Sequence, residues 1–203
     1  VVMGPEKKSR VMSDKEKKLT AYHEAGHAIA IKLVSSTDRV DRISIIPSVM
    51  AGGYVFGRPE EDVSYRTKSQ LLESIVVSLG GRAAEEIVLG EISTGASSDL
   101  KHANGVARDI IIKYGMSEKL SNLIFRNEND EVFIGRDFAQ SKNYSEETAS
   151  IIDREVKNII DNAYEKTLSI LKENIHKLHV VAKTLMEKEK IEGPEFEEIF
   201  ASA

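Results

Sequence analysis

The sequence contains no cysteine in its 203 residues. Disulfide bonds and thiolate metal sites are therefore excluded, and a metal ion bound here must be held by histidine or carboxylate side chains. The lack of cysteine is compatible with a reducing compartment, where disulfides are rare.

Long apolar runs are also missing. No segment approaches the roughly 18 consecutive apolar residues that a membrane-spanning helix needs, and the charged segment 6–18 argues against a signal peptide. We expect this chain itself to be soluble. Apolar residues still make up 41% of the sequence, which is enough for the core of a medium-sized domain.

Positive charge is not in excess, because 28 lysine and arginine residues stand against 33 aspartate and glutamate residues, for a net charge of −5. Binding to nucleic acid depends on clustered lysine and arginine side chains. We therefore expect no nucleic-acid partner.

The apolar periodicity predicts a mainly α-helical fold with a small β element. Ser13 and Glu16 have the spacing of a capping box, so a first helix should begin at Asp14. Further helices are expected over about 67–89, 99–114, from 145 onward and around 178–185 before a break at 193–194, and short strands at 42–46, 54–56, 123–125 and 132–134. Gly80 and Gly81 fall within the second helix, where each costs about 1 kcal/mol relative to alanine. This pair indicates either close helix packing or a break.

Residues 23–27 are His-Glu-Ala-Gly-His, an H-E-x-x-H motif within the first predicted helix. His23 and His27 are one helical turn apart, so both imidazoles can reach one ion. Zinc suits such a site, because histidine nitrogens and a carboxylate supply three ligands and leave one position for water. Glu24 can accept a proton from that water, whose pKa zinc lowers to about 7. The motif therefore predicts peptide hydrolysis by a zinc metalloendopeptidase.

The third ligand must come from elsewhere in the chain. The extended metzincin motif is excluded, because its downstream glycine and histidine are absent from the corresponding positions. One candidate is Asp99 at the start of the third helix, where a helix N-terminus favours an ionised carboxylate. The others are Glu85, Glu86 and His102. The two glutamates are also typical of a helix face or of an ion pair with Arg82, so residue types alone leave the choice open.

Three segments resemble the peptidase domain of FtsH-type ATP-dependent zinc metalloproteases. They are residues 21–28 around the motif, residues 79–87 in the second helix, and residues 93–100, which are Ser-Thr-Gly-Ala-Ser-Ser-Asp-Leu. Shorter matches occur at 45–47, 114–117 and 193–196. The order and spacing of these segments agree with the family over nearly the whole chain.

The resemblance implies a set of site residues. It assigns one zinc ion per chain to His23, His27 and Asp99, and the role of catalytic base to Glu24. Glu85 corresponds to a family position that ranks second as the third ligand.

The resemblance also implies a longer parent protein. Residues 1–12 would be a linker from an AAA-type ATPase domain, and residues 13–203 the zinc metallopeptidase domain. No G-x-x-x-x-G-K-[ST] phosphate loop occurs in this sequence, so ATP would be used by the ATPase domain. The parent protein is expected to be a homo-hexamer, anchored by N-terminal segments at the cytoplasmic side of the bacterial inner membrane. Its substrates would be unfolded or misassembled membrane and soluble proteins, and a β edge near the strand at 42–46 could pair with an extended substrate.

Two interpretations from other classes stand beside this one. The first is an inactive structural module with the same fold, against which the intact Glu24 argues. The second is a helical interaction domain with metal-free histidines and the charged region 145–190 as its contact surface, although such a region is usually only a solvated helix face. Bound metal and casein hydrolysis distinguish the three.

Overall fold

The computed structural model describes residues 12–47, 52–59, 65–120, 122–125 and 144–203. Its elements, in chain order, are α1 (Asp14–Val34), β1 (Asp38–Ser44), β2 (Tyr54–Pro59), α2 (Lys68–Leu89), the 3-10 helix η1 (Thr94–Ala96), α3 (Ser97–Ile112), α4 (Glu146–Glu173), α5 (Ile175–Lys188), β3 (Lys190–Glu192) and α6 (Gly193–Ser202). The prediction of a mainly helical fold with a small β element is confirmed. None of the helices in these described ranges has both the length and the apolar character needed to cross a membrane.

Local capping signals set the ends of the two helices that carry most of the site. The Ser13 hydroxyl accepts a hydrogen bond from the backbone N–H of Glu16 and begins α1, as predicted. Thr67 and Gln70 form a complete capping box at the start of α2. Gly90 ends α2 in the left-handed conformation, with a φ of 66°.

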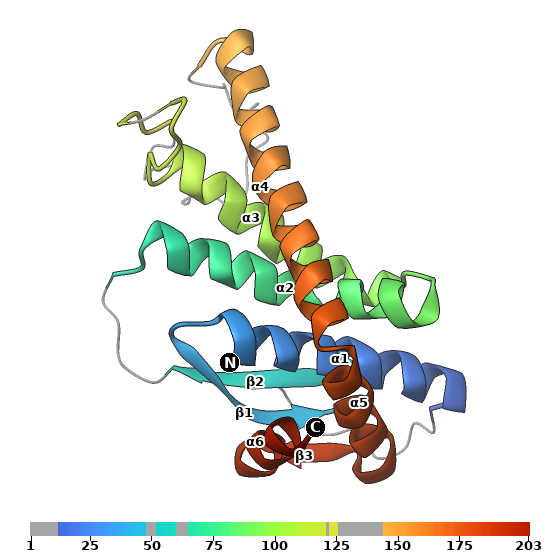
Figure 1. The fold of residues 1–203 in the computed structure, drawn as a ribbon. Helices are drawn as coiled ribbons and strands as arrows, with labels where there is room; N and C mark the ends of the chain where they lie inside the picture. Colours follow the sequence, from blue (N-terminus) through green and yellow to red (C-terminus); the bar gives the residue numbers. More distant parts are fainter. Residues whose placement is uncertain (1–11, 48–51, 60–64, 121, 126–143) are drawn as a thin grey trace, which may run out of the picture.

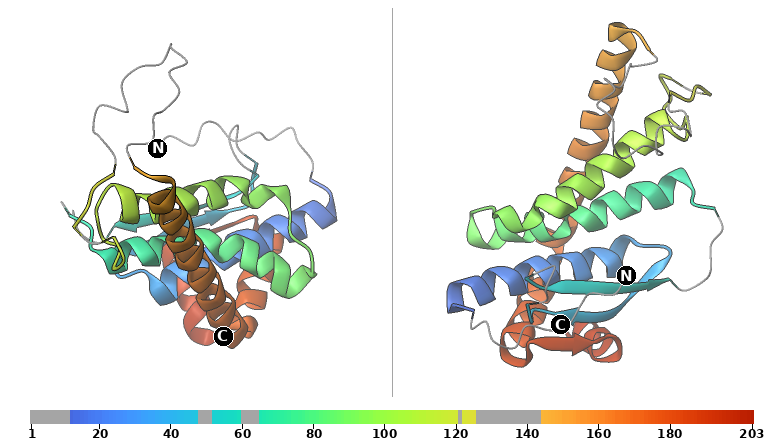
Figure 2. Two further views of the ribbon diagram at one scale, coloured as in Figure 1. Left: turned by 90° about the horizontal axis from the view of Figure 1, so that it is seen from above. Right: turned by 180° about the vertical axis from the view of Figure 1, so that it is seen from behind.

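The sheet, α1, α2 and α3 lie one above the other in that order (Figure 1). Helix α4 packs against α2 and α3, and its N-terminal half rises away from the sheet, as the view from behind also shows (Figure 2). Helix α5 packs against α1, and α6 packs against β1. The first helix is therefore enclosed between the sheet and α2.

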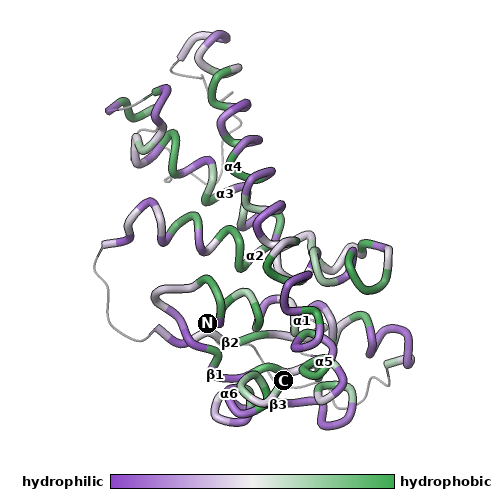
Figure 3. Tube along the Cα trace, in the orientation of Figure 1, coloured by the Kyte–Doolittle hydropathy of each residue, from purple (hydrophilic) through white to green (hydrophobic). Residues whose placement is uncertain are grey.

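Two hydrophobic cores lie on either side of the α1–α2 contact. The first joins α1, the sheet, α5 and α6 through residues such as Ile29, Ile43, Leu178, Leu185 and Phe196. The second joins α2, α3 and α4 through Ile75, Leu79, Ile110, Ile111 and Ile152. Figure 3 shows apolar and hydrophilic residues alternating along α3 and α4, as expected for helices with one buried side.

The sheet has the order β2-β1-β3, with both pairings antiparallel. Ile43 lies opposite Val55 on one side and Ile191 on the other. The strand predicted at 42–46 is therefore the central strand β1, and the β edge expected near it belongs to a neighbouring strand. Within the described residues, β2 has a strand neighbour on one side only.

The C-terminal end differs from the sequence prediction. Residues 190–192 form β3, which was not predicted, and the Gly-Pro pair at 193–194, predicted as a break, is the start of helix α6. Proline fits this place because its missing N–H is not needed in the first turn of a helix. The strand predicted at 123–125 is wrong, since residues 122–125 contain no strand. The strand predicted at 132–134 lies outside the described residues.

Glycines bring α1 and α2 into backbone contact. A Cβ atom on Gly26 would lie 2.3 Å from the carbonyl oxygen of Gly80, and a Cβ on Gly80 would lie 2.7 Å from that of Gly26. Helix α2 continues unbroken through Gly80 and Gly81. Of the two interpretations of this glycine pair, close helix packing is the one the structure shows.

Replacement of Gly26 by alanine should lower the free energy of unfolding by about 1–3 kcal/mol, because α1 and α2 must move apart to admit the methyl group. Gly105→Ala is the matched control, since a Cβ on Gly105 in α3 meets nothing within 4 Å. It should raise the free energy of unfolding by up to about 1 kcal/mol. Urea denaturation of both variants measures the difference. Equal effects of the two substitutions would contradict the close packing of α1 and α2.

Candidate metal centre

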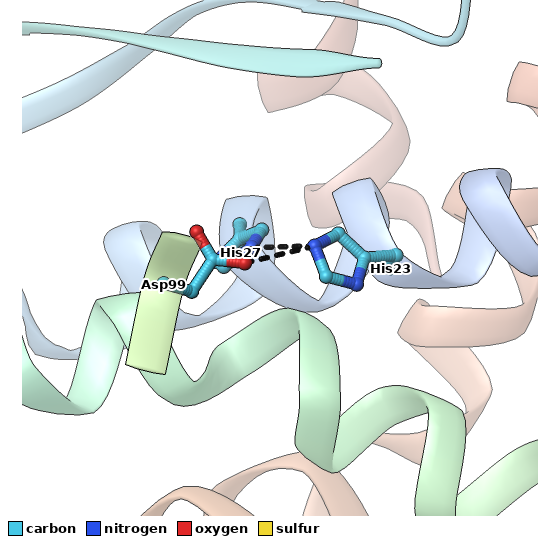
Figure 4. A group of neighbouring side chains, drawn as sticks. All are labelled: His23, His27 and Asp99. Carbon is cyan, nitrogen blue, oxygen red and sulfur yellow. Dashed lines mark hydrogen bonds and ion pairs between the residues drawn. The ribbon is translucent and has the colours of Figure 1, made fainter. Parts of the chain in front are cut away.

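Two histidines and one aspartate converge between α1 and α3 (Figure 4). His23 and His27 project from successive turns of α1, and their Nε2 atoms are 3.1 Å apart. Asp99, in the first turn of α3, brings its Oδ2 atom to 3.2 Å from Nε2 of His23 and 3.6 Å from Nε2 of His27. Among the residues that the structure describes, this is the one group of three such side chains close enough to hold a metal ion.

The spacing of these three atoms fits a zinc ion. Tetrahedral zinc with bonds of about 2.0–2.2 Å holds neighbouring ligand atoms about 3.3–3.6 Å apart. The observed separations of 3.1, 3.2 and 3.6 Å lie close to that range. Two imidazole nitrogens and a carboxylate oxygen are also a donor set that zinc prefers in catalytic sites.

The far side of each imidazole ring is held by an acceptor. Nδ1 of His27 donates to the backbone carbonyl of Val77 in α2 at 2.8 Å, since a carbonyl oxygen only accepts. Nδ1 of His23 is 2.6 Å from Oε1 of Glu85, also in α2. With its only proton on Nδ1, each ring would direct its Nε2 lone pair to the same point, which is the state that a metal ligand requires.

Glu85 is a fully buried carboxylate beneath the histidines. Its Oε1 accepts hydrogen bonds from His23 and from the Ser93 hydroxyl, and its Oε2 accepts one from the backbone N–H of Ser93. Burial raises the pKa of Glu85, but these hydrogen bonds lower it further than burial raises it, so that the carboxylate stays ionised. Both oxygens of Glu85 are thereby engaged away from the Nε2 atoms.

The centre favours a positive charge. Burial lowers the pKa of His23, but hydrogen bonds to Asp99 and Glu85, together with the charge of Glu24, raise the pKa to about 10. Burial raises the pKa of Asp99, but hydrogen bonds from both histidines hold it well below its usual value. The surrounding carboxylates thus stabilise a cation at the imidazoles, whether a proton or a metal ion.

Glu24 lies beside the three converging residues in an open cleft of about 650 Å³. It is buried, and burial raises the pKa of its carboxyl group. A Cβ atom on Gly53, just before β2, would lie 2.7 Å from Oε1 of Glu24. The backbone just before β2 therefore passes close to the Glu24 carboxylate. The cleft that contains Glu24 lies between β2 and the start of α3.

The other three candidates for the third ligand do not join the cluster of His23, His27 and Asp99. Glu86 is exposed on α2 and accepts a hydrogen bond from the Tyr164 hydroxyl. His102 is exposed on α3 and does not belong to the cluster. Glu85 is not part of an exposed helix face, and it contacts the outer side of His23.

Sequence reasoning did not predict two features that support the centre. One is Gly81, where a Cβ would lie 2.5 Å from the ring of His23. The other is the hydrogen bond that Nδ1 of that same ring donates to Glu85. The sequence contained a signal for this contact, because Glu85 follows Gly81 by one helical turn. Glu85 therefore lies on the side of α2 that faces α1, together with Gly80 and Gly81, which we call the glycine stripe.

Comparisons with known proteins agree with this geometry. The model of peptidase family M41 matches residues 10–199. ATP-dependent zinc metalloprotease FtsH of Ruminiclostridium cellulolyticum is 69% identical over 203 residues, which is all of this chain and 33% of that protein. FtsH 1 of a Thermoanaerobacter species is 54% identical over 200 residues, covering 98% of this chain and 33% of the relative. FtsH of Caldicellulosiruptor bescii is 55% identical over 199 residues, covering 98% of this chain and 32% of the relative.

The chain thus spans about one third of the length of these curated relatives. The family match covers the H-E-x-x-H helix, the glycine stripe of α2 and the segment that carries Asp99. The chain therefore belongs to peptidase family M41, as its resemblance to FtsH-type proteases predicted.

Proposed function

We propose that this chain is a zinc endopeptidase in which His23, His27 and Asp99 bind one zinc ion and Glu24 is the catalytic base. The observation that carries the proposal is the convergence of two Nε2 atoms and one carboxylate oxygen at separations of 3.1–3.6 Å. The buried carboxylate of Glu24 lies in the same cleft.

Each protein group has a distinct part in the reaction. Zinc bound at the three ligands would polarise the substrate carbonyl and lower the pKa of water. Glu24 takes a proton from the attacking water and delivers it to the leaving amine as the peptide C–N bond breaks. Val77 and Glu85 fix the ring orientations of His27 and His23 through the Nδ1 hydrogen bonds.

Asp99 fits the role of third ligand better than Glu85 does. Asp99 faces both Nε2 atoms, whereas Glu85 faces Nδ1 of His23, on the opposite side of the ring. A ligand oxygen of Glu85 would have to give up the hydrogen bonds to His23 and Ser93 and leave its fully buried position. The contacts of Glu85 are those of a group that orients a ligand.

The free side of β2 is the proposed place for an extended substrate. Residues 52–55 line the cleft, and a Cβ on Gly53 would lie 2.7 Å from Oε1 of Glu24. A peptide that added to this edge by backbone hydrogen bonds would pass over the catalytic base.

N-methylation of the peptide backbone tests this placement. In a cleaved fluorogenic peptide, methylation at the positions that pair with β2 should raise KM by about 3- to 10-fold, because each lost hydrogen bond contributes about 0.5–1.5 kcal/mol. Methylation near the peptide ends is the control and should leave KM unchanged. A series in which no internal position affects KM would rule out pairing with β2.

Removal of the metal tests the proposed function itself. The purified chain should contain one zinc ion by elemental analysis and should hydrolyse unfolded casein. Dialysis against 1,10-phenanthroline should abolish hydrolysis, and one equivalent of zinc should restore it, because the carbonyl and water are activated only when the ligands are occupied. Full activity of a metal-free chain would refute the proposal.

The relatives support a wider role for the parent protein. They are named ATP-dependent zinc metalloproteases, and they are about three times as long as this chain. We infer that the parent is a membrane-anchored homo-hexamer at the cytoplasmic side of a bacterial inner membrane, which degrades unfolded or misassembled proteins. The 1–12 linker and the 13–203 domain remain predictions within this scheme.

Degradation of unfolded casein by the full-length protein should require ATP hydrolysis, and equal rates of degradation without ATP would contradict the proposed role of the parent protein.

A further inference from the structure

Ser93 lies between the two halves of the candidate centre. It follows α2 and is the N-cap residue of η1, which leads directly into α3. Its backbone N–H donates to Oε2 of Glu85 at 2.7 Å, and its hydroxyl donates to Oε1 of Glu85 at 3.0 Å. The same hydroxyl oxygen accepts a hydrogen bond from the backbone N–H of Gly95 at 3.1 Å. One side chain is thus bonded both to the group beneath His23 and to the loop that precedes Asp99.

The hydroxyl shares its acceptor atom with a histidine. Oε1 of Glu85 receives Nδ1–H of His23 at 2.6 Å and the Ser93 hydroxyl at 3.0 Å. Two donors on one carboxylate oxygen fix its position more closely than one donor does. Because the Glu85 side chain is fully buried, solvent water cannot replace a lost hydrogen bond to this oxygen without entering the core.

The loop between α2 and α3 depends on Ser93 for its side-chain cap. The N-cap residue of α3 is Ala96, which makes no capping hydrogen bond with its side chain. The hydrogen bond from Gly95 to Ser93 is the side-chain cap that the structure records for η1. Asp99 follows within the first turn of α3, so the position of its carboxylate depends on this turn.

We propose that Ser93 is a positioning residue for the metal centre. Its hydroxyl holds Glu85, and through Glu85 the ring of His23, in a fixed position relative to the loop that leads to Asp99. This inference rests on the ligand set proposed above. The hydroxyl touches neither the substrate nor the ion. It acts by keeping ligands from two different helices at the separations that one zinc ion requires.

Four variants test the role of the hydroxyl. Ser93→Ala removes it. Ser93→Thr keeps it and Ser93→Val replaces it by a methyl group of similar shape, and the extended backbone at Ser93 (φ −106°, ψ 167°) accepts both β-branched side chains. Ser145→Ala is the matched control, because Ser145 also caps a helix with its hydroxyl, at the start of α4 and away from the centre.

Zinc affinity, measured by competition with a chromophoric chelator, is the primary readout. Ser93→Ala and Ser93→Val should raise the zinc Kd by about tenfold, the lower end of the range for groups that orient metal ligands. Ser93→Thr should stay within about threefold of the wild type, and Ser145→Ala should leave the Kd unchanged. The visible spectrum of the cobalt(II)-substituted protein should change in the two variants without the hydroxyl and remain unchanged in the other two.

A double-mutant cycle tests the link through Glu85. If the hydroxyl acts on His23 through this carboxylate, Ser93→Ala should weaken zinc binding much less in a Glu85→Gln background than in the wild type. Full additivity of the two changes would overturn the link, and wild-type Kd and spectra for both Ser93→Ala and Ser93→Val would overturn the inference as a whole. If Ser93→Ala fails to fold, the Thr–Val pair decides. Failure of the wild type to bind zinc would instead refute the proposed function.

Discussion

Glu24→Gln is expected to reduce peptide hydrolysis by about 10²- to 10⁴-fold while one zinc ion stays bound. Glutamine fills the same space in the cleft but cannot take a proton from water. Because Glu24 is adjacent to the proposed ligands and does not belong to their cluster, its loss should remove proton transfer and leave metal binding intact. The measurements are kcat/KM for a fluorogenic peptide and zinc content by elemental analysis.

Glu86→Gln is the control for this prediction, because Glu86 is an exposed glutamate on α2 that contacts Tyr164. It should keep the wild-type kcat/KM. Two results would contradict the assignment of Glu24. Activity above about a tenth of the wild type would mean that another group transfers the proton, and loss of zinc would mean that Glu24 is itself a ligand.

Asp99→Asn is expected to raise the zinc Kd by more than about 100-fold and to abolish hydrolysis, whereas Glu85→Gln should raise the Kd by only about tenfold. Asparagine has a similar size, but it lacks the charge that pairs with the ion. Glu85 acts on the back of the His23 ring, so its substitution misorients a ligand without removing one. Chelator competition measures both variants on the same scale.

Asp153→Asn serves as the control, since the Asp153 side chain is 71% exposed on α4 and forms a surface ion pair with Arg108. Its Kd should equal that of the wild type. If Glu85→Gln raised the zinc Kd much more than Asp99→Asn did, Glu85 would be the third ligand.

Much of the helical framework was predictable because its signals are local. Ser13 caps the start of α1, Thr67 caps the start of α2, and Gly90 ends α2. Each of these signals acts on residues only a few positions away in the sequence. The spacing of His23 and His27 likewise depends on one helical turn. Because these features depend only on residues that are close in the sequence, they can be predicted from the sequence.

The remaining features depend on contacts between distant segments. Strand β3 is only three residues long, and it exists because β1, far along the chain, pairs with it. The third ligand could not be chosen from residue types, because the distance from Asp99 to α1 is set by how closely α1 and α2 pack. That packing depends on Gly26 and Gly80, whose lack of side chains brings the backbones together. The role of Glu85 has the same origin, since it becomes a partner of His23 only after the helices are in contact.

The most direct test is a crystal structure of the zinc-loaded chain with anomalous diffraction recorded at the zinc absorption edge. The ion should lie within about 2.0–2.2 Å of Nε2 of His23, Nε2 of His27 and a carboxylate oxygen of Asp99, with Glu85 still bonded to Nδ1 of His23. An ion bound by Glu85 in place of Asp99, or one bound away from the two histidines, would contradict the account.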